Sequence, residues 1–208
     1  MVYFYESQPD ADLPGYQIIA GRDKFENDLL IKYFYRELNH IWFHVDKYSS
    51  GHVYLKLQND KQTLGDVPRA VVSDCLQLCK SESIQGNKLD QCTIVITPWT
   101  NLRKSGYMKP GEVSFKATSR CKKMVCHARD NKVLNRLAKT RVALDDGVET
   151  LLHEAKKSKD GRFFTEYLSA HRERLLLEER EKKQAKKLKK RLQKQETDPT
   201  DNEPTVSL

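Results

Sequence analysis

The side chains best suited to catalysis or ligand binding lie in one short stretch, IWFHVDKYSSGHVYL, at residues 41–55 of the 208-residue sequence. It contains His44, Asp46, Lys47, Ser49, Ser50, Gly51 and His52. Histidine and aspartate are common metal ligands, and serine with histidine and aspartate forms the triad of many hydrolases. Lysine, hydroxyl groups and a glycine backbone instead suit a phosphate–sugar chain, because they offer charge, hydrogen bonds and close approach. Three chemistries are therefore candidates for this stretch.

Metal binding and catalysis receive little support from the surrounding pattern. No CxxC or HExxH spacing accompanies the histidines, and no GxSxG motif surrounds the serines. The order His-Val-Asp echoes the His-Pro-Asp signature of J-domains, but the proline is absent and a strand-like run precedes it. We therefore predict no metal, no cofactor and no catalytic residue. An enzyme that modifies RNA or a nucleotide through His44, Asp46 and His52 stays open as the alternative.

Two further patches combine positive charge with features that favour nucleic acids. The first precedes a predicted helix, whose N-terminus attracts phosphate, although the capping carboxylate of Asp23 competes for the same N–H groups. The second is TPWTNLRK at residues 97–104, where an indole that stacks on an unpaired base precedes two cations. The predicted nucleic-acid contacts in all three patches are Gly21, Arg22, Lys24, His44, Lys47, His52, Trp99, Arg103 and Lys104.

The elements that position these residues follow from hydrophobic periodicity. Extended segments are indicated at residues 2–6, 16–21, 41–45, 52–57, 92–99, 111–115 and 123–127, the first two as a hairpin. Helices are indicated at residues 21–34, 69–83, 131–145 and 163–195. Asp23 and Glu26 have the spacing of a capping box, and Val72, Cys75, Leu76 and Cys79 form one apolar stripe. We predict an α/β fold with a single mixed sheet that ends near His127.

Charge divides the chain into three regions. The sequence carries a formal net charge of +8, so an anion such as nucleic acid is the expected partner. Residues 128–195 hold twenty Lys and Arg against eleven Asp and Glu. We predict an α/β domain at residues 1–127, a charged helical region with at most a short coiled coil at 128–195, and a disordered acidic tail at 196–208.

Cysteine usage and hydropathy indicate a protein of a reducing compartment. The five cysteines are odd in number, and the first residues lack the basic and then apolar plan of a signal peptide. No apolar run approaches the roughly 20 residues that cross a bilayer. We expect free thiols, no membrane span and a cytoplasmic location. A nuclear location is the alternative, because KKQAKKLKKR at residues 182–191 also has the composition of a nuclear localisation signal.

Five segments in order resemble the NFACT-R domain, the RNA-binding domain that long NFACT proteins of ribosome-associated quality control carry. These segments are GRDKFENDLLIK, IWFHVDKYSSGHVYL, CKSESIQGNK, TPWTNLRK and KPGEVSF. A single such domain followed by a charged helix resembles the stand-alone family of coiled-coil domain-containing protein twenty-five and its fungal J-like relatives. The resemblance implies an α/β domain that binds RNA or DNA through its positive loops. It does not imply the tailing of stalled chains, because the other domains of long NFACT proteins have no counterpart here.

The interpretation that we favour is a non-catalytic nucleic-acid-binding protein. Its expected partner is structured RNA, either tRNA or rRNA and including RNA on the ribosome, with DNA as the alternative ligand. The basic helix would add affinity that is independent of sequence and sensitive to salt. A scaffold whose helix at residues 163–179 pairs with another protein through Phe164 and Leu168 is the remaining hypothesis.

Overall fold

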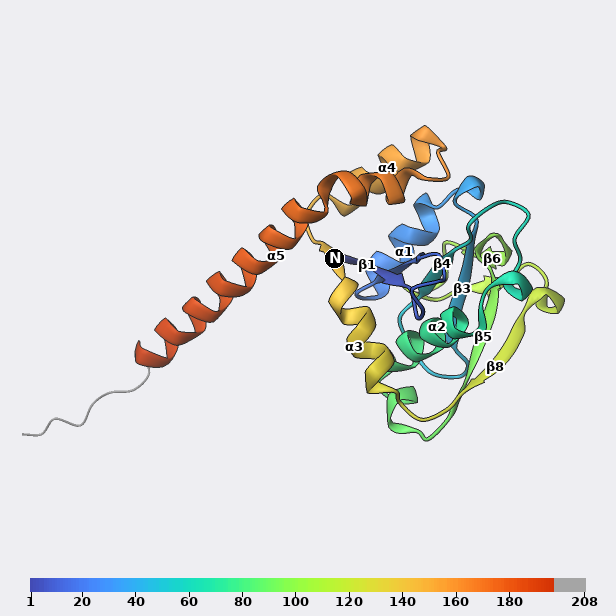
Figure 1. The fold of residues 1–208 in the computed structure, drawn as a ribbon, viewed down its shortest axis with the longest axis horizontal. Coiled ribbons are helices and arrows are strands. Elements are labelled where there is room, and N and C mark those ends of the chain that lie inside the picture. Colours follow the sequence, from blue (N-terminus) through green and yellow to red (C-terminus); the bar gives the residue numbers. More distant parts are fainter. Residues whose placement is uncertain (197–208) are drawn as a thin grey trace, which may run out of the picture. The chain divides into compact units, whose positions relative to one another are not determined.

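The computed structural model describes residues 1–196, and the chain divides into two compact units, Met1–Ala170 and His171–Leu208. Figure 1 shows the order of its elements. The strands are β1 (Val2–Ser7), β2 (Tyr16–Gly21), β3 (His40–Val45), β4 (Val53–Lys56), β5 (Cys92–Pro98), β6 (Leu102–Arg103), β7 (Ser114–Phe115), β8 (Lys122–Cys126) and β9 (Val142–Leu144). The α-helices are α1 (Lys24–Tyr33), α2 (Arg69–Ser81), α3 (Asn131–Thr140), α4 (Val148–Ser158) and α5 (Phe163–Glu196).

Seven strands form one sheet in the order β8-β5-β3-β4-β2-β1-β9, and each of its ladders is antiparallel. β1 and β2 form the predicted hairpin, in which Val2 lies opposite Gly21. The predicted extended segment at residues 92–99 contains β5, which is an interior strand between β3 and β8. The predicted α/β class is confirmed.

One face of the sheet is covered by α2 and α3, which lie together in Figure 1. The predicted stripe of α2 is buried in this core, together with Phe43 of β3 and Ile94 of β5. Burying a large apolar side chain stabilises the fold by about 1.5–3 kcal/mol. The stripe thereby fixes both the position of α2 and the face of each strand that points inward.

The opposite face of the sheet carries an aromatic core. The Phe34 ring centroid, just after α1, lies 4.8 Å from that of Tyr54 and 6.2 Å from that of Phe164. Phe164 also lies 5.9 Å from Phe4 of β1 and is 2% exposed. The alternation of apolar and polar residues at 53–58 predicts a half-buried strand with Tyr54 on its solvated side, but Tyr54 is fully buried. Phe164, which the scaffold hypothesis assigns to a protein partner, packs inside the unit Met1–Ala170 instead.

Two buried charged groups tie the layers together. The Asp74 carboxylate of α2 accepts hydrogen bonds from Ser7 Oγ at 2.7 Å and from the Arg136 guanidinium of α3. Lys80 of α2 is 1% exposed, and its Nζ donates to three carbonyl oxygens, those of Leu89, Asp90 and His127. Buried charges with such partners hold specific geometry, because losing one partner leaves the other desolvated.

The sheet extends farther along the sequence than its predicted end near His127. β9 pairs with β1 as the far edge strand, and α3 packs on β1. The predicted helix at residues 131–145 therefore ends at Thr140, where the β-branched Val142 enters the sheet. The predicted strand at residues 111–115 is also displaced, because β7 pairs with β6 in a separate two-stranded sheet.

The remaining expectations concern the edges of the fold. β8 is an edge strand, and its Lys122, Lys123, Met124 and Val125 are exposed. Gly161 lies between α4 and α5, and α5 is one helix of 34 residues that contains the predicted helix at residues 163–195. The acidic tail that was predicted to be disordered lies beyond residue 196, outside the described residues.

Within residues 1–196, each helix is too short or too polar to span a bilayer.

Candidate nucleic-acid interface

The first patch is built where β2 meets α1. A Cβ atom at Gly21 would lie 2.4 Å from Asn27 Oδ1, so glycine permits α1 to start against the strand. Asp23 Oδ1 accepts hydrogen bonds from the N–H groups of Phe25 and Glu26. The capping function predicted for Asp23 is confirmed, and these N–H groups are consequently not available to a phosphate. The Glu26 carboxylate pairs with the Met1 amino group, which explains why the capping box is incomplete.

The two cations of this patch differ in availability. Arg22 Nη2 lies 3.2 Å from Asp23 Oδ2 and 3.7 Å from Glu26 Oε1, so acidic neighbours offset its charge. Lys24 makes no ion pair within the described chain, and its Nζ lies 5.2 Å from the centroid of the Phe25 ring. Phe25 itself is 60% exposed. Lys24 and Phe25 thus present a cation and an aromatic face side by side.

The second patch is the turn between β3 and β4. Lys47 has a φ of 68°, and this left-handed conformation directs the chain around the turn. Its side chain is exposed and forms no ion pair among the residues that the structure covers. Asp46 is neutralised by Lys123 of β8, whose Nζ lies 2.7 Å from its Oδ2. The turn therefore contributes one accessible positive charge, that of Lys47.

The histidines of the turn contribute stacking and structure rather than charge. The His44 ring stacks on Trp42 with centroids 5.3 Å apart and an interplanar angle of 6°. Burial lowers the pKa of His44 and lowers that of His52 to about 3, so both are neutral near pH 7. His52 is 1% exposed, and its Nε2 hydrogen-bonds the Gly111 carbonyl oxygen. Both histidines are thus neutral groups of the turn, and the predicted contact of His44 and His52 with a nucleic acid stays a prediction.

A loop at residues 104–113 closes over the first two patches. Lys104 Nζ lies 2.9 Å from Asp28 Oδ1 and donates to two carbonyl oxygens of the same loop, those of Lys109 and Glu112. The Gly111 N–H donates to Asp28 Oδ1 at 2.9 Å. Lys104, expected as a nucleic-acid contact, therefore anchors this loop to α1.

The turn, the loop and the start of α1 border two adjoining hollows. The first has a volume of 240 Å³ and is lined by residues that include Arg22, Lys24, His44, Ser50 and Gly111. The second has a volume of 700 Å³, and its lining includes Trp42, His44, Lys47, Lys109 and Phe115. His44, Ser49, Pro110 and Gly111 border both hollows. The fold thus brings the first two predicted patches together.

The third patch forms a separate surface around Trp99. A hollow of 560 Å³ between α1 and β6 is lined by residues that include Lys32, Trp99, Arg103 and Lys116. The half-buried indole of Trp99 packs edge-to-face on Phe34, with centroids 5.9 Å apart. Arg103 is exposed and forms no ion pair among the described residues. A partly open indole beside cations is an arrangement that stacks a base and holds its phosphates.

The polar side chains of the turn between β3 and β4 are largely engaged in hydrogen bonds within the fold. The Ser50 hydroxyl hydrogen-bonds backbone groups of Val45 and Gly51, and the ring nitrogens of His52 are bonded to Gly111 and Tyr54. Across residues 1–196, no group of three or more His, Cys, Asp or Glu side chains is placed to hold a metal. Cys75 and Cys79 are buried free thiols, as their stripe predicts.

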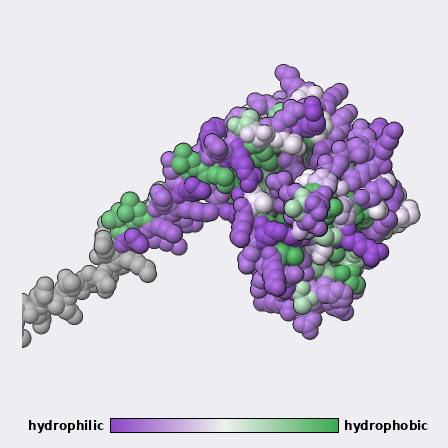
Figure 2. Space-filling view, in the orientation of Figure 1, coloured by the Kyte–Doolittle hydropathy of each residue, from purple (hydrophilic) through white to green (hydrophobic). Residues whose placement is uncertain are grey.

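Sequence reasoning missed two exposed aromatic side chains next to the predicted contacts. Phe25 is 60% exposed beside Lys24, and Tyr107 is 86% exposed in the loop at residues 104–113. Phe25 lies off the apolar stripe of its helix, and Tyr107 follows a glycine in a polar segment. Figure 2 shows a mostly hydrophilic surface with small separate groups of hydrophobic residues. Each ring is a single exposed residue and not part of a contiguous apolar patch, so exposure alone does not mark a site.

An antiparallel sheet with two helical layers and cationic loops at one end defines an α/β binding domain. A family model described as the NFACT protein RNA binding domain matches residues 1–117. Protein JLP2 of Saccharomyces cerevisiae is 63% identical over 198 residues, which is 95% of each chain. Coiled-coil domain-containing protein 25 of Mus musculus is 42% identical over 139 residues, covering 67% of this chain and 65% of the mouse protein. The chain belongs to the NFACT-R family, which supports a role in RNA binding and confirms the resemblance noted in the sequence.

A solved structure shares the fold. The C-terminal part of the fibronectin/fibrinogen-binding protein from Streptococcus suis matches with a TM-score of 0.50 and 18% sequence identity. The match covers 64% of this chain and 48% of that one. At this identity the likeness concerns the fold alone.

Proposed function

We propose that this protein binds structured RNA through the loop end of its sheet and through the Trp99 surface, without catalysing a reaction. The observation that carries the proposal is a set of cations that border the three hollows and form no ion pair in the described part of the chain. They are Lys24, Lys47, Arg103 and Lys109. When such cations contact phosphates, the counterions condensed on the nucleic acid are released, and this release drives binding.

Different residues would contact the phosphates of the RNA and stack on its bases. Lys24 begins α1 and Lys47 lies in the turn between β3 and β4, and the two adjoining hollows that they border suit different phosphates of one backbone. Phe25, Trp99 and Tyr107 offer rings to bases that are not paired. A folded RNA with both helical and unpaired segments matches this combination, whereas a uniform DNA duplex offers no unstacked base.

The basic part of α5 adds affinity of a different kind. Nine Lys and Arg residues lie between Arg180 and Lys194, and the side chains at residues 181–193 are exposed. A helix with this density of charge attracts any phosphate backbone, and the attraction is strongly screened by salt. We infer that α5 raises the overall affinity and that the α/β domain selects the RNA.

The proposal is tested by fluorescence anisotropy with the full chain and a labelled tRNA. Lys24→Ala/Lys47→Ala should weaken binding and reduce the slope of log affinity against log salt by about two, roughly one per lost phosphate contact. Lys132→Ala/Lys139→Ala is the matched control, because these exposed α3 lysines carry the same charge away from the hollows. Equal effects of the two pairs, or none, would contradict the assigned surface.

The target and location extend the same proposal. We infer a cytoplasmic protein whose RNA is tRNA or rRNA, with the ribosome as a platform, because the long members of the family act there. Crosslinking in living cells followed by sequencing of the attached RNA tests this for the full chain and for Lys24→Ala/Lys47→Ala. A discrete set of tRNA or rRNA crosslinks that the variant loses supports the inference. Predominant crosslinks to other RNA or to DNA would overturn it.

A further inference from the structure

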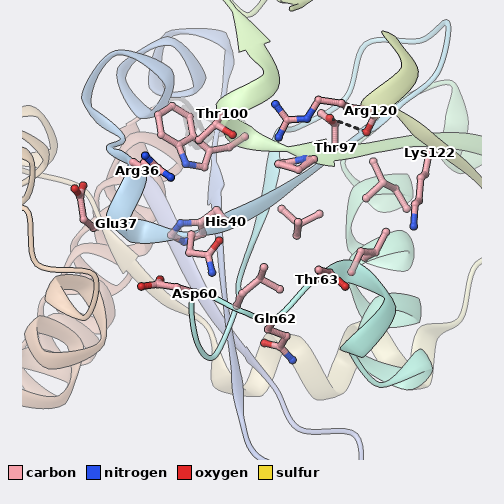
Figure 3. A pocket seen from close by; sticks show the side chains of 17 residues that line it. Arg36, Glu37, His40, Asp60, Gln62, Thr63, Thr97, Thr100, Arg120 and Lys122 are labelled. Carbon is pink, nitrogen blue, oxygen red and sulfur yellow. Dashed lines mark hydrogen bonds between the residues drawn. The ribbon is translucent and has the colours of Figure 1, made fainter. Parts of the chain in front are cut away.

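A fourth hollow lies where β3 begins and β5 ends, and Trp99 is the one predicted contact in its lining. It has a volume of 730 Å³. Its lining comes from the turn before β3, from the loop at residues 57–64, from the end of β5 and from the segment before β8. Figure 3 shows Arg36 on one side of His40, and Arg120 and Lys122 on the other.

His40 is the buried polar group of this hollow. Its side chain is 1% exposed, and neither ring nitrogen has a hydrogen-bond partner in the structure. Burial lowers the pKa of His40 well below its ordinary value, and the nearby charge of Lys56 acts in the same direction. The ring is therefore neutral, with one donor and one acceptor. Buried polar groups without partners are rare, and they are a feature of sites that await a ligand or water.

The rims of the hollow carry separated positive charges. Arg36, Arg120 and Lys122 are exposed, and none of them forms an ion pair in the part of the chain that the structure describes. Glu37 and Asp60 lie on the same side as Arg36 in Figure 3. Their carboxylates accept hydrogen bonds from hydroxyl or amino groups of a ligand, next to the positive charge of Arg36. The lining therefore suits a ligand that has phosphates, hydroxyl groups and polar ring atoms together.

Trp99 supplies the aromatic wall. Its side chain borders both this hollow and the smaller one beside Arg103, so the indole separates two cationic surfaces. The buried Trp99 Nε1 also lacks a hydrogen-bond partner. An indole edge and an imidazole that both await polar partners match the hydrogen-bonding edge of a nucleobase.

We propose that this hollow binds one unpaired nucleotide within an RNA chain, with the base beside Trp99 and His40 and the flanking phosphates at the two rims. The proposal rests on RNA being the ligand of the protein, as proposed above. Cations on both sides favour a continuing chain over a free mononucleotide, whose single phosphate satisfies only one rim.

The first test locates the contact. The full chain is irradiated with ultraviolet light in complex with a short single-stranded RNA, digested with trypsin and examined by mass spectrometry. A nucleotide adduct on the tryptic peptide of residues 89–103, which contains Trp99, is expected. Adducts confined to the peptides that carry Phe25 or Tyr107, with none on residues 89–103, would overturn the nucleotide site and leave RNA binding itself intact.

The second test separates this hollow from its neighbour by anisotropy with the same RNA. Arg120→Ala/Lys122→Ala should weaken binding and lower the salt slope by about two, while the matched Lys132→Ala/Lys139→Ala variant should not. Trp99→Leu should weaken binding roughly 5- to 150-fold, the range for loss of base stacking. The Arg120 and Lys122 side chains are exposed, so their pair reports on the site even if Trp99→Leu fails to fold.

The outcomes distinguish the two proposals. Weakening by Lys24→Ala/Lys47→Ala but not by Arg120→Ala/Lys122→Ala refutes the nucleotide site alone. Failure of the wild-type chain to bind any RNA refutes both. If a free mononucleotide competes as effectively as the oligonucleotide, the hollow does not require a nucleotide within an RNA chain. A mononucleotide carries a single phosphate, which contacts the cations of one rim only.

Discussion

Lys104 Nζ lies 2.9 Å from Asp28 Oδ1 and so fastens the loop at residues 104–113 onto α1. The same ammonium donates to two carbonyl oxygens within the loop. Both partners are about a quarter to a third exposed, so water weakens the pair, which we expect to contribute about 0.2–1 kcal/mol. The contact therefore acts on loop position more than on global stability.

This anchoring makes a specific prediction for Lys104→Ala. The variant should speed amide hydrogen exchange in residues 104–113 and weaken RNA binding while the salt slope changes little, because a positioning group rather than a phosphate contact is lost. Hydrogen exchange by mass spectrometry and anisotropy at several salt concentrations provide the measurements. Arg103→Ala is the comparison, since its exposed side chain should lower the slope without loosening the loop. The reverse pattern would show that Lys104 touches phosphate.

The buried Asp74 predicts a large effect on stability. Its side chain is 1% exposed and holds both Ser7 and Arg136. Asp74→Ala should lower the free energy of unfolding by about 3–5 kcal/mol, because Arg136 loses its buried partner. Urea unfolding measures the change, with Ser73→Ala on the exposed side of α2 as the control. A loss below roughly 1 kcal/mol would mean that water replaces the pair.

The depressed histidine pKa values predict a stability that falls in acid. Because the folded pKa of His52 is about 3 and the unfolded one is near 6.5, the unfolded state binds more protons between these values. Stability is thus complete above about pH 6.5 and falls by about 1.4 kcal/mol per pH unit for this group on acidification toward pH 3. Urea unfolding at pH 7.5, 6 and 5 tests this. His52→Gln should show a shallower dependence than the exposed-site variant His127→Gln.

The cysteines predict stepwise alkylation. Cys92 lies directly opposite Cys126, and four of the five thiols are buried, Cys121 being half-exposed. Burial raises the pKa of Cys126 to about 11, and thiols in such surroundings react slowly. Iodoacetamide should modify Cys121 first in the native chain and the others only after unfolding. Mass spectrometry of the alkylated protein checks the order, and rapid native labelling of Cys92 would count against this packing.

Phe164 predicts where the folding unit ends. Because it packs against Phe4 and Phe34, Phe164→Ala should destabilise the protein by about 3–5 kcal/mol. A fragment that ends at residue 127 would lose β9 and this aromatic contact, and should not unfold cooperatively. A fragment of residues 1–170 retains both. Circular dichroism during thermal unfolding distinguishes the two, with Thr165→Ala as an exposed neighbour control.

Local sequence patterns predicted the elements near the site but not their long-range partners. The alternation in β4 and the stripe of α2 correctly indicated a strand and a helix, because both are set by residues a few positions apart. β9 was missed, since a strand of three residues after a helix has no periodicity to detect and is defined by its pairing with β1. Tyr54 was misplaced because its covering ring, Phe34, comes from twenty residues earlier.

In the candidate site, too, residue types could be predicted from the sequence but their long-range contacts could not. Residue type identified Lys24 and Lys47 as cations, but only three-dimensional contacts show that they lack carboxylate partners while Arg22 and Lys104 have them. The role of His52 depended on the carbonyl oxygen of Gly111, fifty-nine residues away. The hollow around His40 was invisible in the sequence, because segments distant along the chain form its lining.

The lysines of β8 have a consequence for the behaviour of the protein in concentrated solution. An edge strand with exposed Met124 and Val125 offers free N–H and C=O groups to a second chain, and this is a common route to aggregation. Lys122 opposes such pairing, because two copies would bring like charges together, whereas Lys123 is paired with Asp46. The side chain that we propose faces RNA thus also disfavours self-association through this edge.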